Sequence, residues 1–318
     1  MTERDIAAVE ASRRVGGVRQ ADEAGPPSAI TIVSGGVSVN VNNHGGCWTS
    51  FLTTELRALA QRLRASGLSA RRASCSGGDV LFDLGAPATW GSALTGVSAA
   101  YLIEPDLRAS ILSPERLPDL VDTAVHAGVR RLVLLSALTA DSDSHPLHPG
   151  DQAVRRSGVS WTILRPTWFA QNFSEDFWRP GILAGTLAAP TGDGRTPFVD
   201  AEDIADVAAS ALTDDRHGGA VYDLTGPRAL SFGEATGLIG RATGCVVRHA
   251  DVDPEVFVER QVAYGVPAEV ARLLTELLTD VRSGSAEAVT DGVQRALGRP
   301  PASFEQFVAR SATAGAWN

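Results

Sequence analysis

The fold is decided by the stretch Arg131-Leu132-Val133-Leu134-Leu135-Ser136. Its unbroken aliphatic run leaves no polar face, which is typical of a strand buried on both sides in the middle of a parallel sheet. A helix predicted over Pro114–His126 precedes it, with leucine and valine at helical spacing, and ends at Gly128. A similar strand, Ser160–Leu164, follows a short helix predicted around Gln152–Arg156. This alternation indicates strands of one parallel sheet covered by helices.

The same alternation continues toward the N-terminus. A helix over Ser50–Ala65 has an apolar face, and four further strands are predicted over Ala29–Val33, Ser69–Ala73, Val80–Leu84 and Ala99–Ile103. We therefore predict an α/β fold: a doubly wound, Rossmann-like parallel sheet of at least six strands.

Beyond Pro166 the pattern loosens into helices with strong capping signals. Ser231 opens a capping box, Asp253-Pro254 opens a second helix, and Ser303 caps a last one. These helices predict a smaller, mainly helical C-terminal substrate lobe above the carboxyl ends of the strands. The predicted organisation is an N-terminal extension over residues 1–28, a Rossmann-like domain over 29–225 with a lobe-forming loop at 167–196, and the smaller lobe over 226–318.

Composition excludes several kinds of function. The 318 residues carry a net charge of −9, which argues against a nucleic-acid-binding surface. All 28 basic residues are arginine, so Schiff-base, phosphate-loop and Tyr-x-x-x-Lys chemistry are impossible. We expect no membrane span and no secretory signal, and the three widely separated cysteines are typical of a reducing cytoplasm.

Several segments, in this order along the sequence, resemble those of a known protein family. They are 127–136 (AGVRRLVLLS), 157–166 (SGVSWTILRP), Phe169-x-x-Asn172, Pro197–Ala205, Leu224–Pro227 and Gly298–Pro300. With them the sequence resembles the NmrA-like branch of the atypical short-chain dehydrogenase/reductase superfamily over roughly two thirds of its length. The resemblance implies an NAD(P)H-dependent reductase of quinones or other small molecules, or a cofactor-sensing regulator.

The turn after the first strand departs from this family. Its relatives carry T-G-A-T-G-x-x-G, in which glycines let the backbone approach the pyrophosphate. Here a longer segment runs from Ser34 to Trp48 and offers Gly35, Gly36, Gly45 and Gly46. The latter two glycines either form an anion site or are ordinary loop glycines.

The remaining cofactor residues also follow from the resemblance. An arginine that binds the 2′-phosphate of NADP usually follows the second strand, but here Arg71 and Arg72 precede that position and Cys75 or Ser76 occupies it. The position therefore selects neither cofactor: it lacks the arginine that would bind the 2′-phosphate of NADP, and it lacks an acidic residue that would bind the ribose of NAD. Besides Arg71 and the glycines, we assign Pro105, Ser136 and Pro166 to the cofactor site.

Three polar residues are candidates for catalysis. Ser136 ends the central strand, where related enzymes place a hydroxyl beside the nicotinamide; alternatively it only bonds to backbone. His148 is a candidate proton donor or base, or else a surface histidine. Asn172 is suited to orient a carbonyl. Asp151 is expected to be a helix N-cap, and no metal site is expected because Pro146 and Pro149 oppose a helix that would bring ligands together.

Aromatic residues follow the strand that ends at Pro166. Such side chains either stack on a planar substrate or pack between the lobes. The substrate-side candidates are Trp168, Phe169, Asn172, Trp178 and Tyr264. We expect Asp200 to be the N-cap of a helix and Asp203 to interact favourably with the positive end of that helix. Tyr101 and Tyr222 are expected to lie in the core.

Three functions remain open from the sequence. The first is an NAD(P)H-dependent reductase of a small aromatic or quinone-like molecule. The second is a cofactor-independent enzyme on the same scaffold, such as a cyclase, isomerase, dehydratase or lyase, in which His148, Ser136 and Asn172 act directly on substrate. The third is a ligand-sensing regulator without catalysis. A homodimer is compatible with each, and no nucleic-acid or membrane partner is expected.

Overall fold

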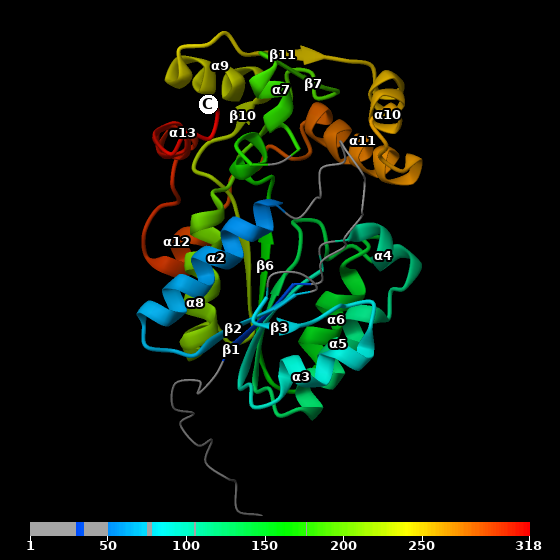
Figure 1. Ribbon diagram of the computed structural model, residues 1–318, viewed down its shortest axis with the longest axis vertical. Helices are drawn as coiled ribbons and strands as arrows, with labels where there is room; N and C mark the ends of the chain where they lie inside the picture. The colour runs from blue at the N-terminus through cyan, green and yellow to red at the C-terminus, as the bar shows by residue number, and fades with distance from the viewer. Residues whose placement is uncertain (1–29, 35–49, 75–77, 105, 176) are drawn as a thin grey trace, which may run out of the picture.

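A seven-stranded parallel sheet forms the centre of the molecule (Figure 1). The computed structural model describes residues 30–34, 50–74, 78–104, 106–175 and 177–318. The strands lie in the order β3-β2-β1-β4-β5-β6-β9, and each neighbouring pair is parallel. Their bounds are β1 Ile30–Ser34, β2 Ala70–Ser74, β3 Val80–Leu81, β4 Ala99–Ile103, β5 Arg131–Leu135, β6 Ser160–Pro166 and β9 Ala220–Leu224. The order reverses between β1 and β4, which confirms the predicted doubly wound, Rossmann-like sheet.

Helices cover both faces of this sheet. One layer consists of α2 (Ser50–Ala65), α8 (Ala201–Thr213) and α12 (Gly292–Leu297), and the other of α3 (Trp90–Leu94), α5 (Arg116–His126) and α6 (His148–Arg156). Alternate strand residues supply the two cores: Tyr101 and Val133 face α2 and α8, whereas Leu102 and Leu132 face α5 and α6. Tyr101 and Tyr222 are buried, as predicted.

A third hydrophobic cluster builds the small lobe, which we define as the elements packed around Phe173, Trp178, Phe198 and Phe232 (upper part of Figure 1). Its helices are η2 Ala170–Phe173, α7 Arg179–Leu183, α9 Phe232–Thr243, α10 Pro254–Ala263, α11 Ala268–Ser283 and α13 Phe304–Thr313. Two short ribbons complete it, β7 (Thr186–Ala189) beside β11 (Arg248–Asp251) and β8 (Arg195–Thr196) beside β10 (Leu230–Ser231). Phe173 packs at 4.6 Å from Trp178 between ring centroids.

Three connecting helices complete the described secondary structure: η1 Pro87–Thr89, α4 Leu107–Leu112 and η3 Asp215–His217. The predicted capping signals are confirmed. Ser231 and Ser303 each form a reciprocal capping box, Asp253 caps α10 with Pro254 in its first turn, and Asp200 caps α8. Gly128 has φ +97°, so the chain can turn sharply from α5 toward β5.

Two segments differ from the sequence expectation. Residues 292–297 were predicted within the smaller lobe, but α12 packs against α8 and β9 because Val293 and Ala296 belong to the core on that side of the sheet. In addition, α6 begins at His148 instead of near Gln152. Proline lacks only an N–H that would be unpaired in a first helical turn, so Pro149 does not prevent this start.

No helix in the described ranges is both long enough and apolar enough to cross a membrane.

Candidate active site

A buried polar network lies at the carboxyl ends of β5 and β6. The Ser136 hydroxyl donates to Asp151 Oδ1 at 2.5 Å, and Arg165 donates to Asp151 Oδ2 from Nε at 3.2 Å and Nη2 at 2.7 Å. All three residues are buried, and Asp151 is 0% exposed. Because its hydroxyl hydrogen is committed to Asp151, Ser136 offers acceptor lone pairs to any ligand at this edge.

The predicted N-cap role of Asp151 is wrong. Leu147 is the N-cap residue of α6, without a side-chain cap, and Asp151 lies within the first turn. Its carboxylate turns toward the sheet because Arg165 would otherwise be a buried charge without a partner. Gly150 allows α6 to pack closely against α5, because a Cβ at this position would lie 2.3 Å from Leu117 Cδ2.

Arg165 is the centre of a wider cluster of charges. Its Nη1 lies 3.8 Å from Asp141 Oδ2, and it also interacts electrostatically with Asp223, which pairs with it in register on β9. Burial raises the pKa of Asp223, whereas Arg165 opposes that effect. Asp223 Oδ1 is buried without a hydrogen-bond partner among the described residues.

Two histidines lie between β5 and the first turn of α6. His148 Nδ1 lies 3.2 Å from the carbonyl oxygen of Ala140, and its Nε2 lies 3.3 Å from Asp143 Oδ1. An imidazolium at His148 would therefore find an oxygen acceptor at each N–H. Asp143 is exposed, so its carboxylate connects Nε2 of the ring to solvent.

The aromatic loop after β6 mostly fills the core. Trp178 is buried against Phe173 and Phe232, and Phe169 is buried beside Val199. Trp168 is half-buried at 5.4 Å from the Trp178 ring, so it retains accessible surface. Tyr264, at the end of α10, is 66% exposed.

Asn172 is a buried polar residue of that loop. It is 7% exposed, and its Oδ1 has no hydrogen-bond partner in the part of the chain that the structure describes. A buried amide oxygen that lacks a donor is costly, so a ligand N–H or a water is expected to satisfy it.

The described residues fit a nicotinamide dinucleotide. The sheet reverses its order between β1 and β4, where ligands of open α/β sheets bind. Helix α2 begins beyond β1 with no acidic residue in its own first turn, and the positive end of a helix is the part that binds a diphosphate in such sheets. Asn172 Oδ1 provides an acceptor of the kind that a carboxamide NH₂ requires.

The structure does not describe all of the residues that we assigned to the cofactor site. Gly35, Gly36, Gly45, Gly46 and Pro105 lie outside the described residues. Pro166 ends β6 and is buried.

The contacts of Arg71 argue against its predicted role at the cofactor. Its Nη1 donates to the carbonyl oxygens of Ala93 and Thr95 at 3.1 and 3.2 Å. Because α3 leads into the start of β4, these carbonyls lie at the amino edge of the sheet, opposite the predicted cofactor crevice.

A second buried acid belongs to α2 itself. The hydroxyl of Tyr101 on β4 donates a hydrogen bond to Glu55, and both side chains are 0% exposed. Burial raises the pKa of Glu55 to about 8, and the hydrogen bond from Tyr101 opposes this shift. Glu55 is therefore protonated in the folded protein at pH values where an exposed glutamate is ionised.

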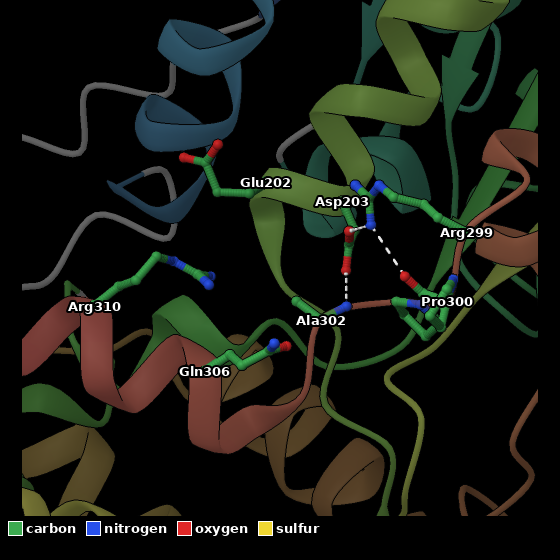
Figure 2. Close-up of a pocket in the computed structure, with 8 residues that line it drawn as sticks. Glu202, Asp203, Arg299, Pro300, Ala302, Gln306 and Arg310 are labelled. Carbon is green, nitrogen blue, oxygen red and sulfur yellow. Dashed lines mark hydrogen bonds and ion pairs between the residues drawn. The ribbon is translucent and has the colours of Figure 1, made fainter.

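An open pocket of about 690 Å³ lies on the α8 side of the sheet, between α8 and α13. In Figure 2, Arg299 and Ala302 converge on Asp203, while Glu202, Gln306 and Arg310 surround the opening. Arg299 Nη1 lies 2.6 Å from Asp203 Oδ1, and the Ala302 N–H donates to Oδ2 at 2.7 Å. Asp203 thus joins the α12–α13 connection to the sheet domain, which is a structural role.

Replacing Arg299 with alanine should lower the free energy of unfolding by about 1–2 kcal/mol, because buried Asp203 loses a charged partner that is itself half-exposed. Denaturant unfolding measures this change. Arg228→Ala is the control, since both members of the Arg228–Glu305 pair are exposed and its loss should cost less than about 0.5 kcal/mol. Equal effects of the two variants would contradict the proposed role of Asp203.

Across the residues that the structure places, no group of three or more His, Cys, Asp or Glu side chains is arranged to hold a metal ion.

Sequence reasoning missed three residues of this site. Arg165 and Asp223 interrupt apolar strands at paired positions, and a charged residue there signals a buried partner. The third residue, His145, gives no comparable signal because it lies in a turn. The polar chemistry is thus concentrated at the edge formed by β5, β6 and β9, as in dinucleotide-dependent folds of this class.

The sequence also matches known proteins. Residues 80–215 match a family described as NAD(P)H-binding. The chain is 35% identical to the uncharacterized oxidoreductase YesF of Bacillus subtilis, over 69% of this chain and 76% of that protein. It is 31% identical to the NAD(P)H azoreductase of Xenophilus azovorans, over 79% of this chain and 87% of that protein. The chain belongs to the NmrA-like atypical short-chain dehydrogenases/reductases, as the sequence motifs predicted.

Solved structures show a similar fold. The Citrobacter sp. triphenylmethane reductase complexed with NADP(H) superposes with a TM-score of 0.65 at 20% identity, covering 89% of this chain and 99% of that one. Of the three functions open from the sequence, the family and its NAD(P)H-binding segment support the oxidoreductase.

Proposed function

We propose that this oxidoreductase reduces a small, planar, aromatic or quinone-like molecule with NADPH or NADH. The proposal rests on one observation above all, the Ser136–Asp151–Arg165 network at the carboxyl ends of β5 and β6, with His148 on the adjoining turn. Reduction of a quinone consumes one NAD(P)H and one proton and yields a hydroquinone and NAD(P)⁺. The nicotinamide supplies the hydride when bound.

The protein's own groups would divide the remaining work. Ser136, fixed by Asp151, accepts a hydrogen bond from the bound ligand, and Asn172 Oδ1 accepts a second. His148 supplies the proton and is reprotonated from solvent through exposed Asp143. The exposed surface of Trp168 offers a face for an aromatic ring.

The test is NADPH and NADH oxidation by the purified chain with a benzoquinone, a naphthoquinone, an azo dye and a triphenylmethane dye. His148→Gln should lower kcat about 10²-fold, since a positioned acid or base contributes 10²–10⁴-fold, and should flatten the pH profile. His126→Gln, an exposed histidine at the end of α5, is the matched control and should leave the rate unchanged. A wild-type protein that oxidises neither nucleotide with any of these acceptors would refute the proposal.

A further inference from the structure

His145 lies in the series of turns that connects β5 to α6. Its backbone N–H donates to the carbonyl of Ser142 at 2.9 Å, and its own carbonyl accepts the N–H of His148 at the same distance. The ring is half-buried and bends back on its own turn, where Nδ1 accepts the backbone N–H of Leu147 at 3.1 Å.

This hydrogen bond fixes the tautomer. A ring nitrogen that accepts an N–H cannot carry a proton itself, so the hydrogen of a neutral His145 must reside on Nε2. Protonation of Nδ1 would break the bond to Leu147 and leave that backbone N–H opposite a second donor. The turn geometry thus favours a neutral ring whose single N–H donor is at Nε2.

The surroundings of the ring act in the same direction. Burial lowers the pKa of His145, and this effect is larger than the opposing attraction of Asp151 and Asp141. Arg165 and His148 also disfavour a second positive charge. Asp151, Arg165 and Asp141 form the charged cluster at the carboxyl ends of β5 and β6, so His145 lies within electrostatic reach of the candidate active site.

The two histidines are therefore held differently. His148 faces an oxygen acceptor at each ring nitrogen, whereas His145 has a backbone donor at one. Two histidines with opposite hydrogen-bonding environments can divide proton donation and oxygen binding between them.

We propose that His145 is a further catalytic residue, a neutral donor whose Nε2–H binds the carbonyl oxygen of the substrate. This inference rests on the proposed function and narrows the substrate to a molecule with an acceptor oxygen, such as a quinone. A neutral donor stabilises negative charge as it develops on that oxygen and needs no proton transfer of its own.

The first test uses two amide variants of the full chain with a naphthoquinone as substrate. The NH₂ of glutamine reaches the position of ring Nε2, whereas that of asparagine reaches only the position of Nδ1. His145→Gln should retain kcat/KM for the quinone within about 5-fold, and His145→Asn should lose about 10²-fold, the effect of removing one oxyanion donor. The KM for NADPH should stay unchanged in both. Equal rates for wild type and His145→Asn would overturn the inference.

The second test does not depend on activity. Long-range ¹H–¹⁵N correlation spectra of ¹⁵N-histidine-labelled protein should show His145, assigned by its disappearance in His145→Gln, as the Nε2–H tautomer between about pH 7 and pH 8, above the ordinary histidine pKa of about 6.5. An Nδ1–H tautomer or an imidazolium in that range would overturn the role of His145 even if the wild type is an active quinone reductase. A wild type that shows the expected tautomer but reduces no quinone refutes the proposed function, and the assignment of a substrate oxygen fails with it.

Discussion

Replacing Arg165 with methionine should lower the free energy of unfolding by about 3–5 kcal/mol, the usual cost of removing one partner from a buried ion pair. Asp151 is 0% exposed and receives two hydrogen bonds from this guanidinium. In the variant, the Ser136 hydroxyl would be the remaining donor of those described. Equilibrium unfolding in urea at neutral pH measures the change.

The matched control removes the charge on both sides. In Asp151→Asn/Arg165→Met the carboxylate at position 151 is no longer left without its guanidinium partner, and the amide oxygen of asparagine still accepts from Ser136. Asp223 loses the attraction of Arg165 equally in the single and the double variant. This double variant should therefore be more stable than Arg165→Met alone. A loss of less than about 1 kcal/mol in the single variant would show that the pair is solvated, and would contradict the buried network described above.

Replacing Glu55 with glutamine should stabilise the protein strongly, but only at alkaline pH. The folded pKa of Glu55 is raised to about 8 from its usual 4.5, so folding favours the protonated acid. The stability that the wild type derives from this protonated acid is present below the unfolded pKa and is lost as the pH rises toward about 8. The difference between the variant and the wild type should be small near pH 4.5 and about 4–5 kcal/mol near pH 9.

Thermal or urea unfolding across this pH range measures the difference. Glutamine still accepts the Tyr101 hydroxyl, so packing is preserved. Glu276→Gln, on the exposed side of α11, is the control and should produce no comparable pH dependence. A Glu55→Gln curve that stays parallel to the wild type from acid to alkaline pH would show that Glu55 is ionised in the folded protein.

The sheet was predictable because its signals are local. The stretch 131–136 is apolar at every position except its ends, and the capping boxes at Ser231 and Ser303 need only residues three apart. Such patterns determine a strand or a helix start whatever surrounds them.

The polar site was only partly predictable because its partners are distant in sequence. Asp151 looks like an N-cap locally, but the demand of buried Arg165, 14 residues later, outweighs the capping preference. Asp223 is paired with Arg165 only through the register of β6 and β9. Arg71 was assigned because it stands shortly before the position, after the second strand, where relatives carry an arginine for the 2′-phosphate. Its side chain instead donates to the carbonyl oxygens of Ala93 and Thr95 at the end of α3.

Calorimetric titration of the full chain with NADPH and with NADH tests the central claim most directly, namely that the carboxyl edge of this sheet holds a nicotinamide cofactor. We expect saturable binding of at least one nucleotide, with one site per chain and a Kd on the order of micromolar, about −8 kcal/mol. Absence of binding by both nucleotides at roughly millimolar concentration, where even a −4 kcal/mol interaction would register, would contradict the account.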